Sequence, residues 1–311
     1  MKKKIAILGS TGSIGKTTIE IVKKNKDKYK IVLLTSNNNI NEIIKHKNFL
    51  NEKKINFKKK KKFNLIKKRL INKKINIFND FNSFNKIFKS KIDYTMSSIS
   101  GLEGLKPTLD IIKFTKKIAI ANKESIICGW NLINKKLVKY KTTFIPVDSE
   151  HFSIWSLINN SNNNTIDEIV ITASGGPFLK IPVRNLKNVT ISQALKHPNW
   201  TMGKKISIDS ATMMNKVFEV IEAQKIFNIP IKKFKILIHP RSYLHAIVKF
   251  NNGLIKMLIH DTTMSIPIFN SINDNDKIKT NKINYSILNN LSLSLVSKEK
   301  FPSIKILESL D

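Results

Sequence analysis

The chain has 311 residues, a formal net charge of +33 and a hydrophobic fraction of 41%. This length fits two domains, and the apolar content is too high for a disordered protein. The single cysteine, Cys128, excludes an intrachain disulfide and a cysteine-based zinc site, and we expect it to be buried and inert. Lys, Asn and Ile are abundant together whereas Arg is scarce, so compositional drift explains the charge better than nucleic-acid binding does.

The start of the chain does not predict a secreted protein. Three lysines precede the apolar run Ile5–Leu8, which ends at Gly9 and is too short for a signal peptide. No other stretch approaches the ~18 uninterrupted apolar residues of a transmembrane helix. We therefore expect a cytoplasmic protein that binds neither membrane nor nucleic acid and whose charge attracts anionic ligands.

The first half of the sequence predicts a doubly wound α/β sheet. Ile5–Leu8 and Ile31–Leu34 are continuous apolar runs, typical of buried parallel strands, and Thr17–Lys24 between them has helical periodicity. Together they form one βαβ unit, whose crossover is nearly always right-handed. Further strands are predicted at Lys54–Phe57, Ile75–Phe78, Ile92–Ile99, Lys117–Ala121 and Thr143–Val147. Residues 1–147 are therefore expected to form a Rossmann-type domain.

The second half predicts an α+β catalytic domain over residues 148–268. Strands are expected at Ile166–Thr172, Ile236–His239 and His245–Phe250. One long helix is expected at Ser210–Phe227, with Ser210 as its cap. Residues 269–311 are expected to form a linker and a residual C-terminal segment.

A glycine-rich turn between the first strand and the first helix indicates a dinucleotide site. Gly9, Gly12 and Gly15 are spaced three apart, which lets the backbone approach a pyrophosphate at the start of a helix. A tight turn without a ligand is the alternative. The second strand ends in Thr35–Asn39, which contains no carboxylate. NAD sites usually place an acid there, so its absence permits NADP.

Three carboxylates indicate a site for a divalent cation. Asp148 and Glu150 leave a strand two residues apart and point the same way, and Glu219 lies on the long predicted helix. An all-oxygen set of this kind suits Mg²⁺ or Mn²⁺. On spacing alone, surface acids are an equal alternative. The chain has only 22 acidic residues, however, and three that converge beside apolar strands favour a metal site.

Hydroxyl, amide and ammonium groups near the same helix indicate an anion site. Ser174 belongs to a glycine turn, while Ser210, Asn215 and Lys216 begin the long helix and offer the donors that a phosphate needs. Ser210 can be a plain helix cap as well. Of the histidines, only His197 is expected to be functional, since Trp200 beside it can close over a ligand.

Several long sequence motifs resemble those of the 1-deoxy-D-xylulose 5-phosphate reductoisomerase family. The matching segments, in the family's order, are GSTGSIG at 9–15, ANKES at 121–125, PVDSEH at 146–151, SGGPF at 174–178, HPNW at 197–200, MGKKISIDSATMMNK at 202–216 and IHP at 238–240. This resemblance spans residues 1 to about 270.

The resemblance implies a role for individual residues. The residues implied for NADPH are Thr11, Gly12, Ser13, Ile14, Asn37, Asn39, Asn122, Glu124 and Gly203. The residues implied for the substrate are Lys123, Ser149, Glu150, Ser174, His197, Ser210, Asn215, Lys216 and Glu219. The implied metal ligands are Asp148, Glu150 and Glu219, and the implied catalytic residues are Lys123, Glu150 and His197.

The resemblance also implies an activity and an assembly. Family members use NADPH and Mn²⁺ or Mg²⁺ to rearrange and reduce a small sugar phosphate to 2-C-methyl-D-erythritol 4-phosphate, and they form homodimers. This chain departs from the family pattern in three places. Asn37-Asn38-Asn39 replaces Gly-Lys-Asn, which removes a cation near the 2′-phosphate, and Val217 replaces a glycine and is expected to crowd the site. We also expect the family's C-terminal helical domain to be largely missing.

Other function classes remain open at this point. One is a dehydrogenase for another sugar phosphate, and another is a catalytically weakened or non-catalytic remnant that keeps the fold. A nucleic-acid protein is the last, and it would bind DNA with a steep salt dependence.

Overall fold

The computed structural model describes residues 1–37, 39, 41–42, 45, 54–57, 76–78, 84–159, 161–200, 202–273, 289 and 291–310, with the backbone alone at 54–57, 76–77 and 164. Most of the expected linker, residues 274–288, lies outside the described residues, as does Ile75 of a predicted strand. No helix among the described residues is both long enough and apolar enough to cross a membrane.

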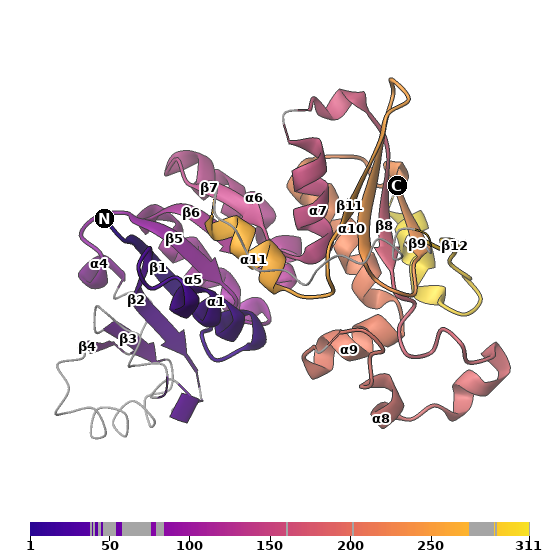
Figure 1. Ribbon diagram of the computed structural model, residues 1–311, viewed down its shortest axis with the longest axis horizontal. Coiled ribbons are helices and arrows are strands. Elements are labelled where there is room, and N and C mark those ends of the chain that lie inside the picture. Colours follow the sequence, from indigo (N-terminus) through magenta and orange to yellow (C-terminus); the bar gives the residue numbers. More distant parts are fainter. Residues whose placement is uncertain are drawn as a thin grey trace. The chain divides into compact units, whose positions relative to one another are not determined.

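The chain divides into two compact units (Figure 1). The first comprises Met1–Val147 with Pro267–Asn275, and the second comprises Asp148–Ile266 with Asp276–Asp311. The change of unit after Val147 coincides with the predicted boundary. The division beyond Ile266 differs from the expected one, because the chain returns to the first unit before its last residues join the second.

The first unit is built on a seven-stranded parallel sheet. Its strands are β1 (Lys3–Leu8), β2 (Tyr29–Ser36), β3 (Lys54–Phe57), β4 (Asn76–Phe78), β5 (Ile92–Ser97), β6 (Thr115–Ile120) and β7 (Thr143–Pro146), in the order β4-β3-β2-β1-β5-β6-β7. All neighbouring pairs are parallel. The α/β prediction is therefore confirmed. The order reverses between β1 and β5, and such a switch point is where doubly wound sheets bind ligands.

Helices connect these parallel strands. They are α1 (Ser13–Lys24), α4 (Phe84–Ile87), α5 (Leu105–Ile111) and α6 (Lys123–Lys139), with 3₁₀ turns at Leu102–Gly104 and Ile112–Phe114. Continuous apolar runs such as that of β1 are buried because helices cover the sheet. Cys128 was expected to be buried, and this prediction is wrong. The buried side of α6 runs through Ile126, Gly129 and Ile133, which leaves Cys128 exposed.

Helix α11 (Ser265–Ile272) explains the return of the chain to the first unit. Ile268, Phe269 and Ile272 of this helix are buried. The Ser271 hydroxyl forms a 2.7 Å hydrogen bond with the hydroxyl of Tyr94 on β5. Apolar burial and a buried polar contact therefore fix this short segment to a strand that lies far away in the sequence.

The second unit contains a five-stranded mixed sheet. Its strands are β8 (Ile166–Ala173), β9 (Phe234–Ile238), β10 (Leu244–Phe250), β11 (Ile255–Ile259) and β12 (Ser294–Leu295), in the order β11-β10-β8-β9-β12. Its helices are α7 (Ser149–Ile158), α8 (Ile191–Ala194), α9 (Lys204–Ala211) and α10 (Met214–Phe227). Short 3₁₀ helices lie at Asn163–Thr165, Val183–Asn188, Ile231–Lys233 and Pro302–Ser309.

Helices α7 and α10 pack on one face of this sheet. Ile154 of α7 and Val220 and Ala223 of α10 share a core cluster with Ile169 of β8 and Val248 of β10. Since these two helices carry the predicted metal ligands at their N-terminal parts, the core holds the carboxylates in place. The 3₁₀ helix at the C-terminal end also packs on α10, so the last described residues are part of this unit.

The predicted long helix at Ser210–Phe227 is in fact two helices. Met213 has a φ of 61°, in the left-handed region, and it separates α9 from α10. Ser210 lies near the end of α9 and does not cap α10, so its predicted capping role is wrong. The hydrophobic periodicity continues across the break, and this is why the sequence suggested one helix.

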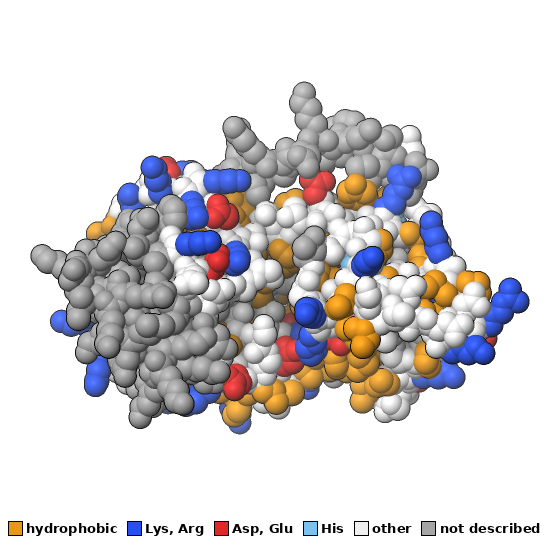
Figure 2. All heavy atoms as spheres, turned by 90° about the horizontal axis from the view of Figure 1, so that it is seen from below, with side chains coloured by type: hydrophobic (Ala, Val, Ile, Leu, Met, Phe, Trp, Pro, Cys, Tyr) orange, Lys and Arg blue, Asp and Glu red, His pale blue; other side chains and the backbone are white. Residues whose placement is uncertain are grey.

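Basic side chains are dispersed on the surface. On the face shown in Figure 2, Lys and Arg are scattered among other side chains rather than gathered in one continuous patch of the described residues.

Candidate active site

The predicted site residues lie in two groups, one in each unit. In the first unit, the glycine-rich turn joins β1 to α1 and is attached to the end of β2. The Gly9 amide donates to Thr35 Oγ1 at 2.9 Å, and Gly9 has a φ of 81°. A Cβ at Gly15 would lie 2.4 Å from the Gly9 carbonyl oxygen, whereas one at Gly12 would meet that oxygen at 3.6 Å. Helix α1 begins at Ser13 with no side-chain cap, so its first backbone amides can receive an anion.

The end of β2 carries only neutral side chains. Thr11 Oγ1 lies 3.2 Å from Ser36 Oγ, and the exposed Asn37 follows. Asn39 Oδ1 accepts a hydrogen bond from the Glu42 amide at 3.1 Å. Asn38 lies outside the described residues. The described part of this turn does not place a carboxylate directly after β2, as expected for a site that accepts a 2′-phosphate.

Asn122 shapes the loops at the switch point of the first sheet. Its Oδ1 accepts the Ser125 amide at 2.9 Å and so caps α6. Its Nδ2 donates to carbonyl oxygens in the turn after β5, including that of Gly101 at 2.7 Å. Lys123 and Glu124 then begin α6, with Lys123 buried and Glu124 half-buried. Asn122 therefore fixes the backbone conformation at Lys123 and Glu124.

In the second unit, the three predicted metal ligands lie together. Asp148 precedes α7, Glu150 belongs to its first turn, and Glu219 belongs to α10. One carboxylate oxygen from each lies within 4.8 Å of those of the other two. Glu219 is buried and the other two are half-buried. The donor set is all oxygen and close enough for one hard cation, so these residues fit Mg²⁺ or Mn²⁺.

Lys216 places its ammonium against this carboxylate group. Its Nζ lies 2.7 Å from Glu150 Oε1 and also forms an ion pair with Glu219. Burial lowers the pKa of Lys216, but the two carboxylates raise it further, and the net shift is upward. Burial raises the pKa of Glu150, but Lys216 outweighs it, and the net shift is downward. Both groups therefore remain charged.

Asn215 contacts a carboxylate as well. Its Nδ2 donates to Glu219 Oε1. Asn215 and Lys216 were both predicted to bind phosphate. Here Lys216 forms ion pairs with two of the predicted metal ligands, and Asn215 donates a hydrogen bond to one of them. A phosphate role therefore requires the Lys216 side chain to turn away from the carboxylates.

Ser174 and His197 form a hydrogen-bonded pair at the turn after β8. His197 Nδ1 accepts the amides of Asn199 at 3.2 Å and Trp200 at 3.0 Å, so the ring proton is on Nε2. That nitrogen donates to Ser174 Oγ at 2.9 Å, and the Gly176 amide donates to the same oxygen at 3.1 Å. Because Ser174 Oγ already accepts two hydrogen bonds, its own hydrogen can be donated to an anion.

The end of α9 packs directly against this turn. Gly176 has a φ of 66°, and a Cβ there would lie 2.7 Å from the Ser210 carbonyl oxygen. Ser210 is thus brought close to the glycine turn that contains Ser174, as predicted for an anion cradle. Gly203, which was predicted to contact the cofactor, is exposed and precedes the first residue of α9.

Two residues beside the carboxylates were missed by the sequence analysis. His151 Nε2 donates to the Glu219 carbonyl oxygen at 2.8 Å, and its Nδ1 lies 3.6 Å from Glu222 Oε2. With Asp148 these residues form a second group that could hold a cation. Burial lowers the pKa of His151, but Glu222 and Asp148 raise it more, so the net shift is upward. The signal was present, since Glu222 follows Glu219 by one helical turn.

Comparison with known proteins decides the family. A family model for 1-deoxy-D-xylulose 5-phosphate reductoisomerase matches residues 5–129, and the model for the C-terminal domain of the same family matches residues 144–227. The chain is 59% identical to 1-deoxy-D-xylulose 5-phosphate reductoisomerase of Pelagibacter ubique (strain HTCC1062), over 99% of this chain and 80% of the relative.

This chain belongs to the 1-deoxy-D-xylulose 5-phosphate reductoisomerase family. Two solved structures of reductoisomerases agree with its fold. One is the Zymomonas mobilis enzyme in complex with NADPH, with a TM-score of 0.89, 33% identity, and coverage of 99% of this chain and 81% of that one. The other is a reductoisomerase in complex with NADPH, fosmidomycin and magnesium, with a TM-score of 0.90, 29% identity, and coverage of 99% and 79%.

Two departures from the reductoisomerase pattern can be placed. Val217 was expected to crowd the site; its side chain is fully buried in a cluster with Ala173, Ile238 and Phe301, and its effect on the site stays a prediction. The chain spans about four fifths of the length of the Pelagibacter reductoisomerase. The expectation of a missing helical domain stays a prediction.

His197 should titrate with a pKa of about 4, because burial and the charge of Lys216 both disfavour the imidazolium ion. Since the folded pKa lies below the ordinary value near 6.5, the neutral ring stabilises the fold above that pH, and this contribution is lost as the pH falls through about 4. An NMR titration, with the signal assigned by its loss in His197→Gln, measures this directly. Titration near pH 6.5 would show that the ring is not held in the Ser174 contact.

Proposed function

We propose that this chain catalyses the NADPH- and divalent-metal-dependent conversion of 1-deoxy-D-xylulose 5-phosphate to 2-C-methyl-D-erythritol 4-phosphate. The carboxylate group of Asp148, Glu150 and Glu219 carries this proposal, because its oxygens lie within 4.8 Å of one another in a member of the reductoisomerase family. The named relatives and their complexes with NADPH and magnesium support it.

Each cofactor has residues that can hold it. A bound Mg²⁺ or Mn²⁺ supplies Lewis-acid polarisation of the substrate's carbonyl and hydroxyl oxygens, and bound NADPH supplies the hydride. Asp148, Glu150 and Glu219 would hold the metal. The backbone from Thr11 to Ile14 would hold the pyrophosphate at the start of α1. The remaining predicted NADPH contacts, which are Asn37, Asn39, Asn122, Glu124 and Gly203, belong to the same proposal.

The substrate's phosphate would bind at the turn after β8. Ser174 can donate its hydroxyl hydrogen, because His197 and the Gly176 amide already occupy its acceptor positions. With Glu150 and Glu219 neutralised by a cation, Lys216 can turn its ammonium to the phosphate. Ser210 and Asn215 would complete this cradle.

The other end of the substrate would meet Lys123, Ser149 and Glu150. Ser149 Oγ donates to Glu150 Oε2, which orients that carboxylate. Glu150 has a pKa held below its usual value, so it is an acceptor over the physiological range and not an acid. Lys123 would polarise the substrate oxygens. His197 would exclude water by holding its segment over the phosphate.

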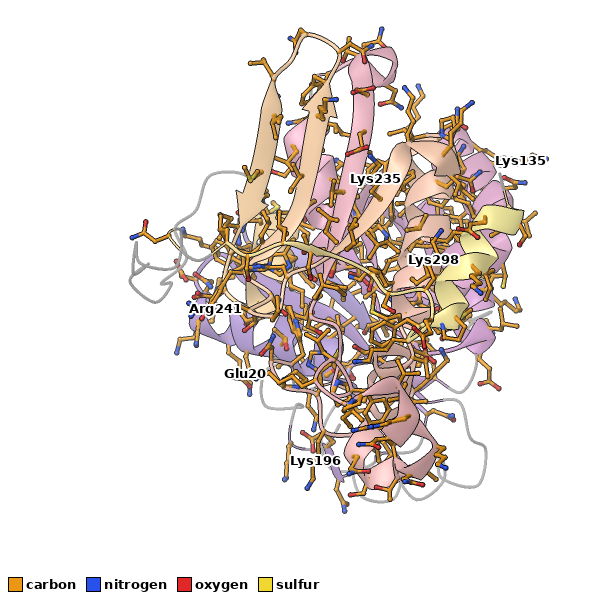
Figure 3. The ribbon with its side chains drawn as sticks, turned by 90° about the vertical axis from the view of Figure 1, so that its right-hand side faces the viewer. Glu20, Lys135, Lys196, Lys235, Arg241 and Lys298 are labelled. Carbon is orange, nitrogen blue, oxygen red and sulfur yellow. The ribbon has the colours of Figure 1, made fainter. Side chains whose placement is uncertain are left out.

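We propose further that the chain works in the cytoplasm as a homodimer through the exposed apolar side chains of β11, an edge strand of its five-stranded sheet. On β11, Ile255 and Met257 are 57% and 53% exposed, and they point to the side opposite Lys256, whose Nζ reaches the carbonyl oxygen of Leu157 on α7. Figure 3 shows the sheet, with Lys235 labelled and the long pair β10 and β11 at one edge. Exposed apolar residues on an edge strand favour pairing with a second copy.

The glycine turn offers a test of cofactor binding. Gly12→Ala should weaken NADPH binding and change the unfolding free energy by no more than about 1 kcal/mol, because the new Cβ meets only one protein atom within 4 Å, at 3.6 Å. Gly15→Ala should destabilise the fold by ~1–3 kcal/mol, because its Cβ would lie 2.4 Å from the Gly9 carbonyl oxygen. NADPH fluorescence titration and urea unfolding measure both effects. Unchanged NADPH affinity in Gly12→Ala would contradict this placement of the pyrophosphate.

The product of the reaction tests the proposed function. The chain is incubated with NADPH, Mn²⁺ and 1-deoxy-D-xylulose 5-phosphate, and the product is identified by NMR. We expect a branched carbon skeleton. A linear reduced sugar phosphate would favour a dehydrogenase, and no product from folded, NADPH-binding protein would favour a non-catalytic member of the family.

A further inference from the structure

Two histidines stack at the ends of β10 and β11. The rings of His245 and His260 have centroids 3.7 Å apart and an interplanar angle of 18°. His245 lies where the register between β10 and β11 shifts, and a bulge of this kind redirects a side chain. His245 is buried and His260 is only 9% exposed, so the stack is an internal part of the fold.

One hydrogen bond in each ring places a proton on a particular nitrogen. His245 Nε2 donates to the His260 carbonyl oxygen at 3.2 Å, and His260 Nδ1 donates to the Asp261 carbonyl oxygen at 2.7 Å. Burial lowers the pKa of both histidines, in agreement with neutral rings. His260 Nε2 is buried and has no hydrogen-bond partner among the described residues. Its ring therefore contributes an aromatic surface, and its second nitrogen is not used.

Trp200 packs against His245 of this stack. Its ring meets that of His245 edge to face, with centroids 6.1 Å apart and an interplanar angle of 70°. Asn199, the preceding residue, donates to the Pro240 carbonyl oxygen at 2.6 Å and to Ser242 Oγ at 2.8 Å. The segment 199–200 is thus docked on the turn between β9 and β10 and on β10 itself.

The docked segment in turn orients His197. The amides of Asn199 and Trp200 both donate to His197 Nδ1, which leaves Nε2 to donate to Ser174 Oγ. A chain of contacts therefore runs from the end of β11 to the hydroxyl at the anion-binding turn. Each step in it is a ring contact or a hydrogen bond between described residues.

We propose that His260 is a positioning residue for the phosphate end of the substrate. Its ring supports His245, His245 supports Trp200, and Trp200 holds His197 against Ser174. This inference rests on the proposed function only in naming the substrate. The docking of Trp200 is a property of the chain alone and can be measured without turnover.

His260→Ala and His260→Phe separate the aromatic surface from every other property of the residue. Losing one aromatic pair corresponds to a roughly 2- to 12-fold change in an equilibrium constant. His260→Ala should therefore raise the KM for 1-deoxy-D-xylulose 5-phosphate about 3- to 10-fold and leave kcat within about 2-fold, as expected when binding alone is lost. His260→Phe should restore the KM, because it keeps the aromatic ring that stacks on His245. It removes Nε2, which has no partner among the described residues, and the Nδ1 donor to the Asp261 carbonyl oxygen, which lies outside the chain of contacts to His197. Lys256→Ala, on the exposed surface of β11, which ends directly before His260, is the control.

The fluorescence of Trp200 gives a readout that does not depend on activity. The chain has three tryptophans, so replacing Trp130 and Trp155 by Phe isolates Trp200. In that background His260→Ala should increase acrylamide quenching of Trp200 and weaken the binding of inorganic phosphate, and His260→Phe should reverse both.

Unchanged KM and unchanged quenching in His260→Ala would overturn the proposal. The proposal would also be overturned if His260→Phe did not restore the wild-type KM and quenching, because the effect of His260→Ala would then not come from the loss of the aromatic surface. If the wild-type chain does not turn over this substrate, the proposed function fails, and the quenching and phosphate titrations still decide the role of His260.

Discussion

Glu219→Gln should lower the rate of substrate-dependent NADPH oxidation by at least about 100-fold at a fixed metal concentration. Loss of a residue that only supports a metal ligand costs about 10- to 100-fold, and Glu219 is proposed as a ligand itself. The substitution keeps the size of the side chain and removes one negative charge from the set of three carboxylates, Asp148, Glu150 and Glu219, whose oxygens lie within 4.8 Å of one another. The rate is measured by NADPH absorbance over a series of Mn²⁺ concentrations.

The control for this change is Glu168→Gln. Glu168 lies on β8, and its ion pair with Lys235 is at the surface, so its loss should leave the rate within about 2-fold. Thermal unfolding shows whether Glu219→Gln is folded. A folded Glu219→Gln protein with the activity and metal dependence of the wild type would contradict the assignment of the metal site.

Lys216→Met should destabilise the metal-free protein by ~3–5 kcal/mol, because it leaves Glu150 and Glu219 buried without their counter-charge. It should also tighten the binding of Mn²⁺, since the ammonium no longer competes for the same carboxylates. Urea unfolding in the presence of EDTA and of Mn²⁺ measures both effects. The stabilisation by Mn²⁺ should be larger in Lys216→Met than in the wild type.

The pH dependence of this stability difference follows from the two pKa shifts. Glu150 has a folded pKa below its usual value, so its contribution is present above about pH 4.3 and is lost as the pH falls through the folded pKa. Lys216 has a raised folded pKa, so its contribution is present below about pH 10.4 and is lost as the pH rises through the folded pKa. The difference between wild type and Lys216→Met should therefore be largest between about pH 5 and pH 10.

Lys235→Met is the matched control, because it breaks an exposed ion pair with Glu168 and should cost no more than about 1 kcal/mol. A similar small loss in Lys216→Met would show that the buried ion pair does not stabilise the carboxylates.

The sequence contained most of the information for the first unit. Apolar runs and the glycine spacing are local signals, and they predicted the parallel strands and the turn between β1 and α1. The return of α11 to β5 was missed, because the Tyr94–Ser271 contact joins residues 177 positions apart and no local pattern reports it.

In the second unit, the convergence of three carboxylates could be predicted but their neighbours could not. Asp148, Glu150 and Glu219 have a recognisable chemistry and spacing. The break at Met213 depends on a left-handed backbone angle in a residue that rarely adopts one, so periodicity predicted a single helix. The ion pair between Lys216 and Glu150 depends on where α7 and α10 meet, and so does the contact between His151 and Glu222.

Electron spin-echo spectroscopy of the Mn²⁺-loaded protein tests the central claim most directly. Among the described residues, two groups could hold a cation, and of these two the group with His151 and Glu222 is the one that offers a nitrogen ligand. We predict one bound Mn²⁺ per chain with no coupling to a histidine nitrogen, because Asp148, Glu150 and Glu219 offer only oxygen. A clear nitrogen coupling that disappears in His151→Gln would contradict the account and would move the metal to the second group.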